Sequence, residues 1–90
     1  MKVIKKPIIV EAWQLKPYRG VYIPRWVSKA ILNKDILYNE ASKSWFINSL
    51  EGTMLAHDGD YLIKGAHDEL YPCREDIFND TYTILKEDKL

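Results

Sequence analysis

Residues 58–78 have the sequence DGDYLIKGAHDELYPCREDIF. Two short runs rich in apolar and aromatic residues, each bounded by turn-forming residues, are typical of paired strands. We expect Gly59 to adopt a positive φ in the Asp58-Gly59 turn, and Pro72 to end the second strand. The acidic residues that follow Arg74 predict a short helix near residues 74–80, because negative charge in the first turn complements the helix dipole.

The strand-like spacing of apolar residues, with a period of two, extends upstream from this segment. Apolar runs separated by turn-forming residues lie at 36–39, 44–50, 53–57 and 60–64. This spacing predicts an antiparallel meander rather than strands that alternate with helices. A further strand is expected over residues 69–71, and a closing strand over residues 81–85.

The amino-terminal third predicts one strand and one helix. Residues 8–15 carry apolar groups on both faces of a strand, so we expect cover on both sides for part of its length. Residues 24–33 predict a helix, with Pro24 in its first turn and Asn33 as a left-handed stop. The fold class is therefore α+β: a small antiparallel β-meander of about five to six strands with two helices. Residues 1–90 form one domain, with a frayed tail at 86–90.

Composition narrows the function classes. The 13 basic and 13 acidic residues balance, which disfavours nucleic acid as a partner because duplex-binding domains are normally basic. The single cysteine, Cys73, excludes an internal disulfide framework and fits a reducing compartment. No apolar run approaches the ~20 residues that span a membrane, and no secretory signal is visible. We therefore expect a cytoplasmic protein with no membrane partner.

The carboxyl-terminal half resembles a family. The segments GDYLIKG (59–65), ELYPCR (69–74), DIF (76–78) and Thr81-Tyr82 resemble the ending of a widespread group of small bacteriophage proteins, mostly of unknown function. That group also tends to begin like residues 7–13 and to carry a segment like residues 45–52. The resemblance implies a phage accessory factor that acts in the host cytoplasm on host or defence machinery.

Aromatic residues beside cations form the candidate binding site. A planar or anionic ligand can be held by stacking and by charge-assisted hydrogen bonds, and exposed aromatics beside arginine also mark protein interfaces. The candidates are Trp13, Arg25, Trp26, Tyr71, Arg74 and Asp76. Tyr18 beside Arg19 has the same character. Arg74 begins a helix, where a cation is disfavoured, so we expect it to pair with Asp76 or with an external anion.

Catalysis and metal binding are weaker readings. Cys73 with His57 or His67 could form a nucleophile and its base, but a lone cysteine is more often a small buried apolar residue. His57-Asp58-Gly59-Asp60 and the segment 67–69 contain metal-ligand types, yet neighbours in a strand point to opposite faces. We therefore expect no catalytic residue, no metal and no cofactor.

Two function classes stay open. The first is a non-enzymatic accessory protein that binds a host or defence protein, or sequesters a small nucleotide-like ligand; an aromatic, cation-lined concavity would favour it. The second is a structural or assembly module of the virion, which a flat, apolar, self-complementary face would favour. In both cases a small sheet with exposed edges favours a homo-oligomer.

Overall fold

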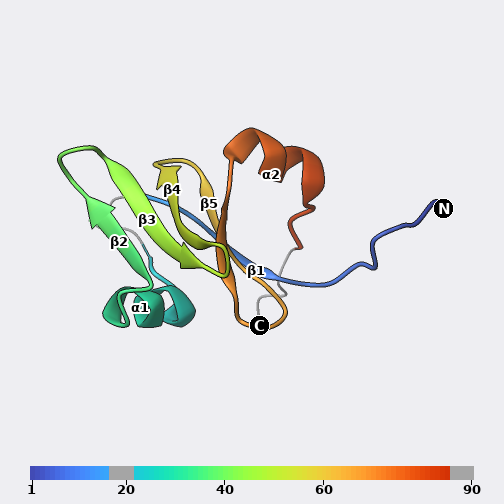
Figure 1. Cartoon of the computed structure of the whole chain (residues 1–90), viewed down its shortest axis with the longest axis horizontal. Helices are drawn as coiled ribbons and strands as arrows, with labels where there is room; N and C mark the ends of the chain where they lie inside the picture. The colour runs from blue at the N-terminus through green and yellow to red at the C-terminus, as the bar shows by residue number, and fades with distance from the viewer. Residues whose placement is uncertain (17–21, 86–90) are drawn as a thin grey trace.

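The computed structural model describes residues 1–16 and 22–85, and within them it has the expected α+β composition. The predictions for Pro17, Tyr18, Arg19 and the tail at 86–90 lie outside the described residues. Six strands form two three-stranded antiparallel sheets, in the orders β1-β5-β6 and β2-β3-β4 (Figure 1). The strands are β1 (Glu11–Gln14), β2 (Ile36–Asn39), β3 (Ser44–Ser49), β4 (Gly52–His57), β5 (Tyr61–Lys64) and β6 (Leu70–Cys73), and the helices are α1 (Arg25–Leu32) and α2 (Glu75–Thr81).

The β2-β3-β4 sheet is a meander whose turns match the local sequence. Its two tight connections place Lys43 at φ 53° and Gly52 at φ 101°. Alternation then sends Ile36, Ile47, Trp45 and Ala56 to one face, where all four are buried. The opposite face carries the row Leu37, Phe46 and Leu55, one residue from each strand.

The β1-β5-β6 sheet joins the two ends of the chain. β1 pairs with β5 over the register Glu11↔Lys64 to Gln14↔Tyr61, and β6 pairs with the other side of β5. Pro72 does not end the strand, contrary to expectation, but lies within β6 opposite Leu62. The Gly65 amide donates to the Glu69 carbonyl, so odd-numbered residues of β6 face β5 and the ring nitrogen of Pro72 faces the open edge.

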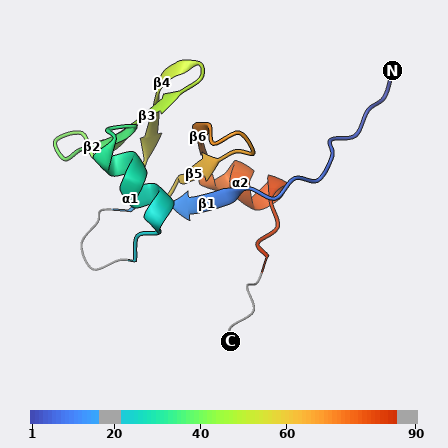
Figure 2. The ribbon, with the colours of Figure 1, turned by 90° about the horizontal axis from the view of Figure 1, so that it is seen from below.

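The first strand is shorter than its sequence pattern predicts. Residues 8–10 lie outside β1, and Ile8 and Ile9 are 58% and 80% exposed, so the expected cover on both sides is absent from these two residues. Residues 1–10 leave the body of the molecule beyond β1 in both views (Figures 1 and 2). Local sequence favours a strand here, but β5 ends at Lys64 and offers no further residues to pair with.

Both helices form where expected, with two corrections. Pro24 caps the amino end of α1, but Asn33 has a right-handed φ of −79° and Lys34 takes the left-handed turn at φ 62°. The closing strand over 81–85 is wrong: Thr81 ends α2, and residues 82–85 form neither strand nor helix. Ring stacking explains this, because Phe78 lies 3.7 Å from Tyr61 and 5.1 Å from Tyr82, centroid to centroid, and holds the segment against the sheet.

One core serves both sheets and α1. Its buried members are Leu15, Val27, Ala30, Ile36, Trp45, Ile47, Ala56 and Leu62. They come from α1, from strands of both sheets and from the residue after β1, so this core joins the two sheets, while Ile63 and Phe78 are buried outside it. Figure 2 shows α1 beside β2 and β3, while α2 lies with the other sheet.

Candidate functional site

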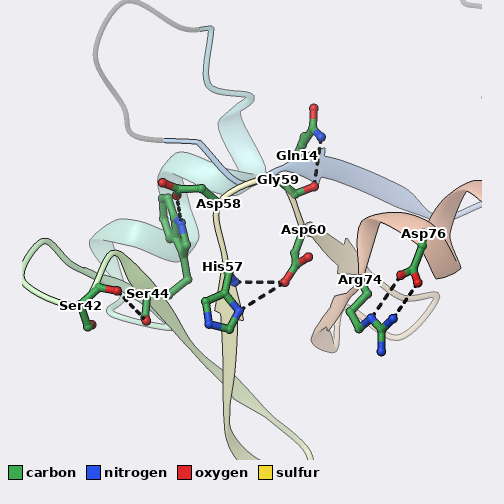
Figure 3. A network of polar contacts seen from close by, with 10 residues as sticks. Gln14, Ser42, Ser44, His57, Asp58, Gly59, Asp60, Arg74 and Asp76 are labelled. Carbon is green, nitrogen blue, oxygen red and sulfur yellow. Dashed lines mark hydrogen bonds and ion pairs between the residues drawn. The ribbon is translucent and has the colours of Figure 1, made fainter.

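The turn between β4 and β5 is fixed by its own polar side chains (Figure 3). Gly59 has φ 96°, as predicted. The Trp45 indole N–H donates to Asp58 Oδ1 at 2.8 Å, and the His57 amide donates to Asp60 Oδ2 at 3.0 Å. Residues 57–60 therefore shape the turn that carries the chain from one sheet to the other, and not a hairpin, because β4 and β5 do not pair. Across the described residues no three His, Cys, Asp or Glu side chains gather as a metal site would require.

Arg74 and Asp76 bind each other. Arg74 Nε donates to Asp76 Oδ1 at 3.1 Å and Arg74 Nη2 to Asp76 Oδ2 at 2.6 Å (Figure 3). The hydrogen bonds from Arg74 lower the pKa of the Asp76 carboxyl, and the bonds to Asp76 raise the pKa of the Arg74 guanidinium. The carboxylate partner considered from the sequence is therefore present, and it engages the guanidinium face that an external anion would need.

The other candidate residues are dispersed. Trp13 packs edge-on against Trp45 at 6.1 Å and lines a hollow of about 330 Å³ with Gln14, Lys16 and Tyr22. Trp26 packs half-buried against the core, and Arg25 is exposed at the start of α1. Of the six candidates, Tyr71 lines a groove that it shares with residues of the amino-terminal segment.

That groove lies between residues 5–10 and the β6–α2 edge. Its volume is about 560 Å³, within the ~300–1,000 Å³ range of small-molecule sites. Tyr71 and Tyr82 form one wall, with their hydroxyl oxygens 3.4 Å apart. Lys5 and Lys6 bring positive charge to the opposite side, and Ile8 and Val10 bring apolar surface. We call this the tyrosine groove.

The groove's polar groups have defined states. Burial, and then the hydrogen bond and charge of Tyr82, raise the pKa of Tyr71, so its phenol stays protonated at neutral pH and can donate to an anion. Glu69 Oε1 accepts the His67 amide N–H at 2.9 Å. This carboxylate also packs against Gly65, where a Cβ would collide with it. The turn next to the groove is thus ordered by Glu69.

Among the groove residues, sequence reasoning named Tyr71 but missed Lys5, Lys6 and Tyr82. Tyr82 was missed because residues 81–85 were expected to form a strand. The available signal was its spacing from Phe78, since residues four apart lie on one face of a helix. Had α2 been expected to end at Thr81, both rings would have been placed against the sheet.

Cys73 has the features of a packed thiol. It is half-buried, and its Sγ lies 3.6 Å from the Arg74 carbonyl oxygen. Burial, together with the charges of Asp60 and Asp76, raises the pKa of the thiol, so little thiolate exists at neutral pH. This is the opposite of the shift that activates a nucleophilic cysteine.

No family model, no curated protein and no solved structure matches the chain. Within residues 1–16 and 22–85, no helix is both long and apolar enough to cross a membrane.

Proposed function

We propose that this chain is a phage-encoded, non-enzymatic accessory protein that sequesters a small anionic, nucleotide-like ligand in the tyrosine groove, in the host cytoplasm. The observation that carries the proposal is the pairing of two phenol rings with two lysines around a groove of ligand size. The phage origin is supported by the resemblance of residues 59–82 to small bacteriophage proteins.

The chemistry of the groove favours a ligand that is both flat and negatively charged. An aromatic face binds a base by stacking, which contributes about 1–3 kcal/mol per base. The protonated Tyr71 phenol and the ammonium groups of Lys5 and Lys6 supply donors for a phosphate. His67 and Glu69 also line the groove, and the Glu69 carboxylate already accepts the His67 backbone amide, which favours a role in shaping the groove over a role in catalysis.

Titration calorimetry with AMP, adenosine and inorganic phosphate tests this proposal. AMP is expected to bind more tightly than either part alone, because it engages the rings and the lysines together. Tyr82→Leu should weaken AMP binding roughly tenfold through the lost stacking. Tyr22→Leu is the matched control, because Tyr22 is 82% exposed and does not line the groove.

The Tyr71→Phe variant and a set of further nucleotides test the groove in more detail. Tyr71→Phe removes the donor while keeping the ring, so it should weaken AMP binding with the fold intact by circular dichroism. Failure of AMP, ADP and cyclic di-AMP to bind at millimolar concentration would contradict the proposal. An equal effect of the Tyr22 and Tyr82 substitutions would also contradict the proposed groove.

A second function is favoured by one different observation. Leu37, Phe46 and Leu55 form an apolar row across the outer face of the β2-β3-β4 sheet, with Leu37 50% and Leu55 54% exposed. Such a flat face suits a structural or assembly module of the virion that packs against further copies of itself. Electron microscopy of concentrated protein, with Leu55→Ser as the disrupting variant, tests it: assemblies that persist unchanged in the variant exclude this face.

A further inference from the structure

Residues 1–10, which we call the N-terminal arm, pair with no strand in the monomer, and all but Val10 are exposed. Ile4 is 92% exposed and Ile9 80% exposed. None of the backbone hydrogen bonds between described residues involves the arm. Natural proteins rarely leave a β-branched run unpaired beside a sheet edge, because it is a template for pairing with another chain.

The backbone of β1 shows which groups meet a new strand. The Leu15 amide donates to the Asp60 carbonyl at 2.8 Å, and the Gly59 amide donates to the Leu15 carbonyl at 2.9 Å, so Leu15 bonds toward β5. Bonding direction alternates along a strand, which turns even-numbered residues such as Ala12 toward the open edge of β1. Carried into the arm, the alternation turns Val10 and Ile8 to that edge as well. Pro7 is an odd-numbered residue, so its missing N–H would not have pointed toward the open edge.

We propose that two copies of this chain pair antiparallel through β1 and the arm, about a two-fold axis at Ile8. A symmetric antiparallel pair centres on a residue that faces its own copy, and opposed residues lie equally far on either side of it. Glu11 lies three residues after Ile8 and Lys5 three before it. Each copy thus places Lys5 opposite Glu11 of the second copy, twice per dimer.

This register is selected by charge. The arm has lysines at positions 2, 5 and 6, and Glu11 is the carboxylate of β1. Lys2 and Lys6 cannot oppose Glu11 in a symmetric pair. The two-fold axis must pass through a residue that faces its own copy, and the midpoint between Glu11 and either of these lysines falls between two residues. Neither Lys5 nor Glu11 has an ion-pair partner among the described residues. Opposite charges facing across strands stabilise the pairing and like charges oppose it.

A second copy also suits the size of the surface. Residues 3–13 would oppose residues 13–3 of the other chain, which joins two three-stranded sheets into one sheet of six strands. About eleven residues a side is less than the ~20–30 of a standard stable interface, so the dimer is expected to dissociate on dilution. The pairing rests on backbone parity and charge and needs no ligand in the tyrosine groove. It engages Lys5, which also lines that groove, and so leaves Lys6 to meet an anionic ligand there.

Sedimentation equilibrium over a range of concentrations, at low salt, tests the pairing. The wild-type mass is expected to rise toward twice the 10.6 kDa of one chain. Lys5→Glu and Glu11→Lys should each weaken dimerisation roughly tenfold, because each makes two like-charge contacts per dimer. The double variant should restore dimerisation. Lys6→Glu is the matched control, since Lys6 would oppose Val10.

Three results would overturn the register. They are a monomer mass at every concentration, a double variant that fails to recover, and a Lys6→Glu effect equal to that of Lys5→Glu. If none of the four variants changes the dimerisation affinity, the interface lies elsewhere, for example on the face that carries Leu37, Phe46 and Leu55. Circular dichroism of each variant checks that the domain stays folded, as expected for exposed positions outside the core.

Discussion

Trp45 is a side chain that connects the two sheets. It is fully buried on β3, packs against Trp13 of β1 and Tyr38 of β2, and donates its indole N–H to Asp58. A buried indole donates its N–H only if an acceptor lies within reach, and the turn after β4 supplies one. A single residue thus ties the meander, the first strand and the β4–β5 turn together.

Trp45→Phe is expected to lower the free energy of unfolding by about 1–3 kcal/mol, because it leaves a small void and removes the bond to the Asp58 carboxylate. Urea denaturation measures the loss. Asp58→Asn is the control: it keeps an oxygen acceptor and should cost less. A larger loss in Asp58→Asn would show that the turn, and not the indole, dominates.

The raised pKa of Tyr71 predicts that folding stability depends on pH in the alkaline range. Its folded pKa lies above the ordinary value of 10.0, chiefly through burial. In the unfolded chain the phenol ionises near 10, so the unfolded state releases this proton first and folding stability falls as pH rises above about 10. Below that pH the contribution is constant.

Ultraviolet titration measures this directly. Tyr38 and Tyr71 both have a raised pKa, with the larger shift at Tyr71, so the last phenol to ionise in the folded protein should be Tyr71, and Tyr71→Phe should remove that last step. A last step that the substitution leaves unchanged would assign the larger shift to another phenol.

At the scale of elements, α2 is held by ring contacts rather than by its own length. It has seven residues, too few for stability as an isolated helix, and Phe78 is its buried member. The Phe78 ring stacks on Tyr61 at an interplanar angle of 8°. The helix therefore depends on β5, and the tyrosine groove depends on the helix through Tyr82.

Phe78→Ala is expected to cost about 3–5 kcal/mol and to release α2 from the sheet. Amide hydrogen exchange should show lost protection over residues 75–82, with β2 to β4 less affected. Ile77→Ala on the same helix is the control, because Ile77 is 46% exposed. Equal effects of the two substitutions would contradict the role of the ring stack.

At the scale of the whole molecule, the shared core predicts cooperative unfolding. Core residues come from both sheets and α1, so separating the two sheets would expose buried residues of each. Tryptophan fluorescence and far-ultraviolet circular dichroism should give coincident urea transitions. Separate midpoints would show that the two sheets unfold independently.

The sequence by itself determined the local features of this chain. The period of two with its turn residues placed the β2-β3-β4 meander, Gly59 fixed the turn before β5, and Pro24 marked the start of α1. The pairing of Arg74 with Asp76 was also within reach, since the two residues are two apart. These features depend on neighbours in the chain, and neighbours are what a sequence displays.

The tertiary structure alone decided how distant segments meet. β1 joins β5 across some fifty residues, the strands divide into two sheets, and α2 turns Tyr82 toward Tyr71 where local pattern favoured a strand. Local propensities of short segments differ by little, so packing against a shared core settles the outcome. The N-terminal arm is unpaired for a related reason. Its sequence favours a strand, but within one chain β5 ends before the arm can pair with it.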